Sequence, residues 1–239
     1  MIGRGPVVQG ESLVDYPGER VARTLARSDR DYPWLLGQIY DPPAHVFVEG
    51  RGCPPGLRVA VVGSFDPTPA RTTLAFRLGY QLARAGAVVV GGLFPGIAAV
   101  AHRGALAAGG SSIAVLAWGL DWPVPAGLQK LRGELARRGM VLSEYPARTP
   151  PSLRQYRASG RVISGLAHGM VIVDGRWPGQ ELLPADFALE QGREVLAVPG
   201  EAGSPLGALP GVLLDCGAVS ALSGRQVVAA IREAGWDTV

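Results

Sequence analysis

Short apolar runs alternate with amphipathic stretches along the chain from residue 58 onward. The apolar runs predict strands at residues 58–62, 87–90, 112–116, 140–143, 170–173 and 194–198. The amphipathic stretches predict helices at residues 68–85, 98–108, 127–138 and 184–191, with a last helix at residues 225–234. Continuous apolar strands separated by helices are typical of a parallel, doubly wound α/β sheet that is covered on both faces.

Glycine residues mark the ends of the predicted helices. Gly86, Gly109, Gly139 and Gly192 each lie where a C-terminal glycine cap belongs. Glycine adopts the left-handed backbone conformation of that position without steric cost. The glycines therefore support the predicted helix boundaries.

The first 55 residues predict a small appendage that precedes the doubly wound domain of residues 56–239. Four features are predicted in it: a poorly packed arm over residues 1–30 with a short helix near 18–27, a short helix over 33–39, an edge strand over 45–48 and a glycine- and proline-rich linker over 50–56. Asp41-Pro42-Pro43 is expected to stop the helix at 33–39, because the residue before a proline disfavours helical geometry.

Composition narrows the class of protein. Hydrophobic residues make up 47% of the chain, yet no apolar run approaches the roughly 20 residues that a membrane span requires. The N-terminus lacks the apolar segment of a signal peptide. Cys53 and Cys216 are far apart and form no CxxC pair, which argues against structural zinc and a disulfide framework. We therefore expect a cytoplasmic protein without a membrane partner.

Two glycine turns follow the first two predicted strands. The first contains Gly63 and Ser64 and leads to Thr68, a predicted helix cap followed by proline; the second runs over residues 91–96. Such turns hold ligands in open parallel sheets, and backbone N–H groups with the Ser64 and Thr68 hydroxyls suit a phosphate. A plain connecting turn explains the first equally well, whereas three glycines in the second favour binding. The sequence contains neither of two common phosphate-binding motifs, GxGxxG and GxxxxGK[ST]. A standard dinucleotide site or P-loop is therefore disfavoured.

The segment from residue 145 to 173 is rich in arginine and contains no acidic residue. Arg148, Arg154, Arg157 and Arg161 surround Tyr156. Guanidinium groups suit phosphates and an aromatic ring suits an unpaired base. The alternative is a solvated arginine face, although such a face usually carries compensating carboxylates. The net charge of +3 does not decide between them. The pattern favours an unneutralised arginine loop that contacts a single-stranded polynucleotide.

No catalytic or metal-ligating group of residues is recognisable. His45, His102 and His168 are isolated in the sequence. Asp186 and Glu190 have helical spacing inside a predicted helix, where both are expected to be exposed. We therefore predict neither enzymatic activity nor a metal or cofactor site.

Seven segments, in order, resemble the DprA/Smf family of DNA-processing proteins over roughly residues 31–220. They are YPWLLGQIYDPPAHVFVEG (32–50), VAVVGS with Thr68 (59–68), VVVGGLFPGIAAVAHRGALAAGG (88–110), IAVLAWGLD (113–121), LSEYPARTPP (142–151), RVISGLAHGMVIVDG (161–175) and ALEQGREVLAVPG (188–200). The resemblance implies an extended Rossmann-like domain that forms a homodimer, binds single-stranded DNA and loads the RecA recombinase during natural transformation, without enzymatic turnover.

Turns, arginine segment and resemblance together predict a set of DNA contacts. The set is Gly63, Ser64, Thr68, Arg71, Gly92, Gly96, Lys130, Arg154, Tyr156, Arg157, Arg161 and Ser164.

The chain departs from the family pattern at several polar positions. Phe65 stands where members usually carry a DNA-contacting arginine, and Ala98 where they carry aspartate. The FPxRNR and SGSLITA segments are changed at residues 156–161 and 179–185. We also expect a member without the C-terminal winged-helix domain that many members carry. We expect Arg71 and Arg157 to relocate positive charge, so that binding is retained but altered.

Two other functions remain open. Similar folds serve in LOG-type hydrolases of nucleoside monophosphates, but their PGGxGTxxE pattern has only fragments here, at residues 91–92 and 199–201. The altered turns are also consistent with a degenerate paralogue that keeps only protein contacts.

Overall fold

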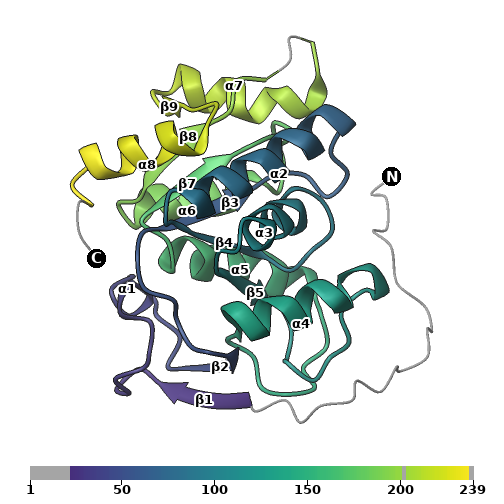
Figure 1. Cartoon of the computed structure of the whole chain (residues 1–239), viewed down its shortest axis with the longest axis vertical. Coiled ribbons are helices and arrows are strands. Elements are labelled where there is room, and N and C mark those ends of the chain that lie inside the picture. The colour runs from purple at the N-terminus through teal and green to yellow at the C-terminus, as the bar shows by residue number, and fades with distance from the viewer. Residues whose placement is uncertain (1–21, 201–202, 237–239) are drawn as a thin grey trace.

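A computed structural model describes residues 22–200 and 203–236, which form one mixed sheet between two layers of helices (Figure 1). The nine strands in this part of the chain are β1 (Ala22–Ala26), β2 (His45–Gly50), β3 (Arg58–Val62), β4 (Val88–Gly92), β5 (Ser112–Leu116), β6 (Met140–Ser143), β7 (Gly169–Ile172), β8 (Glu194–Ala197) and β9 (Val219–Ser220). Their order is β1-β2-β6-β5-β4-β3-β7-β8-β9. Pairings of β2 with β1 and β6 are antiparallel and all others are parallel, which confirms the predicted α/β class.

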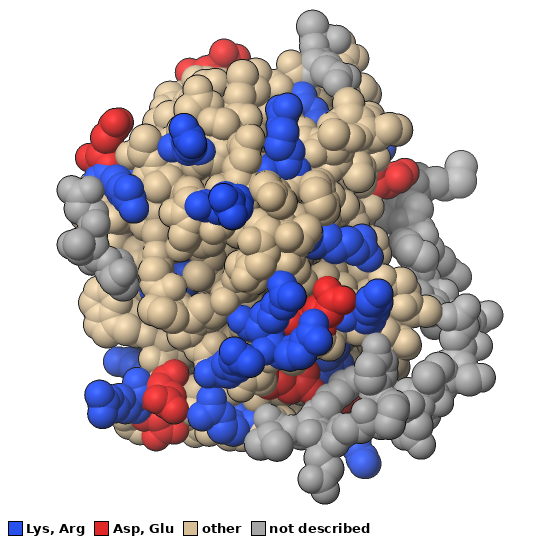
Figure 2. Space-filling model, in the orientation of Figure 1, with Lys and Arg blue, Asp and Glu red and all other residues tan. Residues whose placement is uncertain are grey.

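The helices divide between the two faces of the sheet. They are α1 (Trp34–Gly37), α2 (Pro69–Arg84), α3 (Ile97–Ala107), α4 (Gln129–Arg138), α5 (Leu153–Gly165), α6 (Leu182–Glu190), α7 (Ala208–Asp215) and α8 (Gly224–Glu233), with short 3-10 turns at Ala126–Leu128 and Pro205–Gly207. Alternate strand residues serve opposite faces: Val59 and Val61 pack with α2, α3 and α8, whereas Ala60 and Val62 pack with α5, α6 and α7. Figure 2 shows the side of the molecule with α2, α3 and α4, over which many Lys and Arg side chains are spread.

The strand order places a topological switch point next to β3. From β3 the chain proceeds through β4, β5 and β6 on one side, and then returns to place β7 and β8 on the other side. The connections that leave β3 and β7 therefore run in opposite directions. In open α/β sheets, ligands bind outside the carboxyl ends of the strands at such a point.

Three expectations about local structure were wrong. Residues 22–26 form β1 rather than part of a helix, because they pair along their full length with β2; residues 18–21 lie outside the described part. Strand β2 lies between β1 and β6, so it is not an edge strand. Arg154, Arg157 and Arg161 of the arginine segment lie on helix α5 rather than in a loop, and the Ser152 side chain caps this helix by accepting a hydrogen bond from the Gln155 N–H.

The predicted glycine caps are confirmed at three helix ends. Gly86, Gly109 and Gly192 have φ values of 80°, 82° and 66°. Gly139 differs, with φ at −154°. The reason for glycine there is close packing, because a Cβ would collide with the Ser112 carbonyl. Elements α7 and β9 were not predicted at all.

Candidate functional site

The crevice at the switch point is closed by a buried hydrogen-bonded pair. Asp174, directly beyond β7, accepts a 2.7 Å hydrogen bond from the Ser64 N–H and a 2.9 Å bond from the Ser64 hydroxyl. The Ser64 carbonyl accepts from the Ile97 N–H at the start of α3 (3.1 Å). Burial raises the pKa of the Asp174 carboxyl, and the two Ser64 bonds and Arg71 oppose that rise. The groups of Ser64 that were predicted to bind phosphate are thus used inside the protein.

Arg71 and Thr68 also serve the fold. The buried Arg71 guanidinium donates to the carbonyls of Val173 (3.2 Å) and Pro199 (2.8 Å). Thr68 is the N-cap of α2, as predicted, and accepts a 3.3 Å bond from the Arg71 N–H. The expectation that Arg71 relocates positive charge for DNA binding was wrong, because its guanidinium group is buried against carbonyls just beyond β7 and β8.

The predicted glycines are explained by close packing. A Cβ at Gly63 would meet the Asp174 carboxylate and Ile97, and one at Gly92 would meet the Phe94 ring. Gly96 has φ at 95°, and its Cβ would collide with the Ser64 carbonyl. Gly63 and Gly92 still line the surface described next, whereas Gly96 only shapes the turn beside it.

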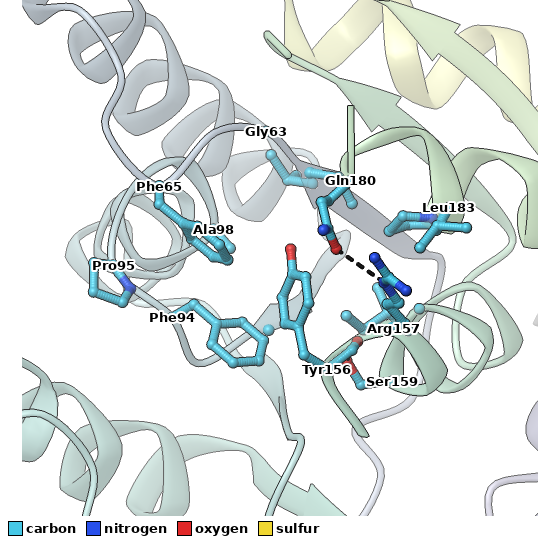
Figure 3. A pocket seen from close by; sticks show the side chains of 16 residues that line it. Gly63, Phe65, Phe94, Pro95, Ala98, Tyr156, Arg157, Ser159, Gln180 and Leu183 are labelled. Atoms are coloured by element: carbon cyan, nitrogen blue, oxygen red, sulfur yellow. Dashed lines mark hydrogen bonds between the residues drawn. The ribbon is translucent and has the colours of Figure 1, made fainter. Parts of the chain in front are cut away.

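Beside the closed crevice, an open recess is bounded by the carboxyl ends of β3 and β4, by α5, and by Gln180 and the start of α6 (Figure 3). It is lined by Val61, Val62, Gly63, Phe65, Gly92, Phe94, Pro95, Ala98, Tyr156, Arg157, Ser159, Gly160, Ile163, Gln180, Leu183 and Pro184. Its cavity volume of about 40 Å³ has room for a few water molecules. Pockets that enclose a small-molecule ligand usually measure about 300–1,000 Å³. The recess can therefore hold the edge or face of a group, but cannot enclose a nucleotide.

Three aromatic rings form the wall of this recess. The centroid of Tyr156 lies 5.0 Å from that of Phe94 and 5.3 Å from that of Phe65. Phe94 also packs edge-on against the buried Trp118, at 5.5 Å. Phe65 remains 48% exposed, so the cluster has a firm base and a face open to solvent. Burial, with a smaller contribution from Glu181, raises the pKa of the Tyr156 hydroxyl to about 12.

Positive charge at the rim comes from the first turns of α5. Arg157 is exposed, and its Nε donates a 3.3 Å hydrogen bond to Gln180 Oε1 across the recess (Figure 3). Arg154, one turn earlier on α5, is exposed as well. Neither arginine takes part in an ion pair within residues 22–200 and 203–236.

Three other predicted contacts lie away from this surface. Arg161 forms ion pairs with Glu144 (2.6 Å) and Asp41 (3.3 Å), so the segment that is acid-free in sequence is partly neutralised in space. Ser164 is fully buried and donates to carbonyls of its own helix. Lys130 is exposed on α4 and does not line the recess. The sequence analysis considered Phe65 only as a lost arginine, whereas the structure places its ring in the wall of the recess.

In the described ranges, no three His, Cys, Asp or Glu side chains are grouped so that they could bind a metal ion. No helix within the same part of the chain has the length and apolar character needed to cross a membrane.

Comparison with known proteins gives a consistent family assignment. The family model for DNA recombination-mediator protein A matches residues 23–232. The DNA processing protein DprA of Bacillus subtilis is 34% identical over 211 residues, which are 87% of this chain and 71% of that protein. The crystal structure of DprA from Streptococcus pneumoniae superposes with a TM-score of 0.81 at 32% identity, covering 87% of this chain and 73% of that one.

A second solved structure extends the agreement in fold. DprA from Helicobacter pylori, a protein with a described mode of single-stranded DNA binding, has a TM-score of 0.78 at 23% identity. The match covers 92% of this chain and 99% of that chain. At this identity the likeness concerns the fold alone.

Proposed function

The chain belongs to this family of DNA-processing proteins, DprA/Smf, and from that premise we propose that it binds single-stranded DNA at the aromatic recess. The observation that carries the proposal is the ring cluster of Phe65, Phe94 and Tyr156 beside exposed arginines that form no ion pair in the described part of the chain. Bases stack on such rings whatever their sequence, and guanidinium groups contact the phosphates between them. The DprA of H. pylori binds the same kind of nucleic acid.

Phe65 makes the proposed site depend more on base stacking and less on phosphate contacts than is expected of the family. Where members usually carry an arginine, this chain adds an exposed ring 5.3 Å from Tyr156 and 5.8 Å from Phe94. Loss of one phosphate contact lowers the salt dependence of binding, and an added stacking face increases the part that salt does not affect. We therefore expect the affinity for single-stranded DNA to depend less on salt than the number of arginines in the sequence suggests.

Binding without turnover is part of the proposal. The polar groups nearest the switch point, Asp174 and Ser64, are bonded to each other, and the recess is lined mainly by apolar side chains. A nucleoside-monophosphate hydrolase would need an acid or base that reaches its substrate. The small cavity also disfavours an enclosed nucleotide.

We further propose the cellular role that the family description names, mediation of recombination. In this role a homodimer holds single-stranded DNA in the cytoplasm and a RecA-type recombinase is loaded on it. Faster assembly of the recombinase on DNA bound by this protein, relative to free DNA, tests that step separately from DNA binding.

The test of the binding site is a titration of fluorescently labelled oligo(dT) followed by anisotropy. Tyr156→Ala should weaken binding by about 1–3 kcal/mol, because one stacking face is lost. Tyr156→Phe should bind like the parent, since the ring and not the hydroxyl does the stacking.

Tyr40→Ala is the matched control, because Tyr40 is fully exposed and does not line the recess. It should bind as the parent does. Equal affinity of Tyr156→Ala and Tyr40→Ala would remove the recess from the DNA site.

A further inference from the structure

The outer side of α2 and α3 carries positive charge without any acidic residue. No aspartate or glutamate occurs between Asp66 and Asp121, a stretch that includes both helices. Arg77 and Arg84 on α2 and Arg103 on α3 are exposed. A solvated helix surface usually mixes the two signs of charge, so this absence of carboxylates is informative.

Two aromatic side chains lie on the same side of α2 as its exposed arginines. Phe76 is 41% exposed and Tyr80 is 40% exposed. With Arg77 and Arg84 they recur at helical spacing, and all four fall in the exposed class. Large rings left half-open along one helix stripe are unusual in a solvated surface, and they alternate here with guanidinium groups.

Close packing of the two helices holds this surface in a fixed shape. A Cβ at Gly79 would collide with the Ala101 carbonyl, and one at Gly104 would collide with the Phe76 carbonyl. The two backbones therefore touch, and the Phe76 and Tyr80 positions lie directly against α3. We call the exposed surface of Phe76, Arg77, Tyr80, Arg84 and Arg103 the α2–α3 face.

The arginines of the α2–α3 face are not neutralised within residues 22–200 and 203–236. Arg77 and Arg84 take part in no ion pair there, and Arg103 donates only to the Gly127 carbonyl, at 3.0 Å. Figure 2 shows several Lys and Arg side chains on this side of the molecule. The charge is thus available to an anionic partner.

Both helices of this face start at the recess. Phe65 lies in the turn that leads to α2, and Ala98 on the first turn of α3 lines the recess itself. At a rise of about 1.5 Å per residue, α2 extends roughly 24 Å from Thr68 to Arg84. A strand that leaves the recess along α2 passes the two rings and then Arg84.

We propose that the α2–α3 face is a second contact surface for the same single strand, with Phe76 and Tyr80 as stacking positions and Arg77 and Arg84 as phosphate contacts. This inference rests on the proposed function. Alternating rings and guanidinium groups suit single-stranded nucleic acid, which offers a base and a phosphate at each step. An apolar protein surface would leave the arginines unpaired, so it fits this face less well.

The test compares two lengths of oligo(dT), because only a strand that outreaches the recess can use the second surface. One oligonucleotide has about 6 and the other about 30 nucleotides. The variants are Arg77→Ala/Arg84→Ala and Phe76→Ala/Tyr80→Ala. The control is Arg51→Ala/Arg232→Ala, which removes two exposed arginines outside the α2–α3 face.

Both face variants should weaken binding of the long strand about tenfold or more and leave the short strand unchanged. For the arginine variant, the slope of log affinity against log salt should also fall by about 1.4, since each phosphate contact on a single strand contributes roughly 0.7. The control should change neither length.

Three results would overturn the inference. Parental affinity of both face variants for the long strand would exclude the surface. An equal loss for both lengths would place the effect at the recess or in the fold. Altered self-association with unchanged DNA affinity, measured by sedimentation, would identify the surface as an interface between copies. The proposed function fails separately, if the parent protein binds neither oligonucleotide.

Discussion

Arg157 at the carboxyl edge of the parallel sheet differs in exposure from two arginines at its amino edge. At the carboxyl edge, Arg157 is exposed, and the neighbouring Tyr156 ring is partly buried. At the amino edge, Arg58 and Arg193 are 6% and 7% exposed. Arg58 Nε donates to the Leu166 carbonyl (2.8 Å) and Arg193 to that of Leu35 (3.3 Å), while the Arg193 guanidinium lies 5.5 Å from the Trp236 ring centroid.

This difference separates arginines that hold the fold from arginines that are free for a ligand. At the amino edge, the guanidinium groups satisfy carbonyls of neighbouring segments, and their removal would leave those carbonyls unpaired. At the carboxyl edge, the exposed Arg157 donates one 3.3 Å hydrogen bond to the Gln180 side chain among the described residues. Positive charge in the sequence is therefore a weak guide to binding, and the partner of each guanidinium group is a better one.

The largest expected effect concerns His168 at the amino edge. Its Nδ1 accepts a 2.9 Å hydrogen bond from the Arg58 N–H, so the neutral ring fits the fold. Burial and the nearby charges of Arg58 and Arg193 lower its pKa to about 4, below the ordinary 6.5. The unfolded chain then binds a proton that the folded protein does not. Stability is fully present above pH 6.5 and is lost as the pH falls toward 4, by on the order of 3 kcal/mol for this group.

Urea unfolding at a series of pH values between 7 and 4 measures this loss. His168→Asn keeps a hydrogen-bond acceptor without a titrating ring, so its stability should fall less steeply with acid. Burial also lowers the pKa of His102 to about 4. Parent and variant therefore share the loss of stability that protonation of His102 causes, and their difference reports on His168. Identical pH profiles for parent and variant would mean that His168 is not held neutral at this edge.

A smaller effect on stability is expected from Arg161, which joins α5 to Glu144 just beyond the carboxyl end of β6. Arg161→Ala leaves Glu144, whose side chain is only 10% exposed, without its 2.6 Å partner. The free energy of unfolding should fall by about 1–3 kcal/mol. Adding Glu144→Gln removes the stranded charge and should restore part of the loss. Urea titration of the parent, the single variant and the double variant checks this, and no difference among the three would contradict it.

The central strands could be predicted because burial on both faces leaves continuous apolar runs, as in 58–62 and 112–116. Helix α5 was missed because its arginines and Tyr156 were read for their chemistry, although Ser152 supplied a cap signal. Strand β1 exists only through its partner β2, so its own pattern was too weak.

The site was predictable in part, for a similar reason. Tyr156 and Arg157, which line the recess, were among the predicted contacts, because an aromatic residue among arginines is visible in the sequence. The Ser64–Asp174 pair joins residues 110 positions apart, and Glu144 reaches Arg161 across the start of α5. Such contacts depend on the order of strands in the sheet, which local periodicity does not encode. Phe65 had a usable signal, an aromatic residue in a turn where burial is difficult.

The smallest expected effect isolates one exposed charge at the carboxyl edge. Arg157→Ala should leave stability unchanged, because within residues 22–200 and 203–236 the Arg157 side chain donates one long hydrogen bond, of 3.3 Å to Gln180 Oε1, and is otherwise exposed. The slope of log affinity for oligo(dT) against log salt should fall by about 0.7, the share of one phosphate on a single strand. Arg51→Ala is the matched control, since Arg51 is exposed and its N–H contacts Gly139 at the amino edge. If both variants keep the parental slope, the rim of the recess does not contact phosphate, and the contrast between the edges is one of exposure alone.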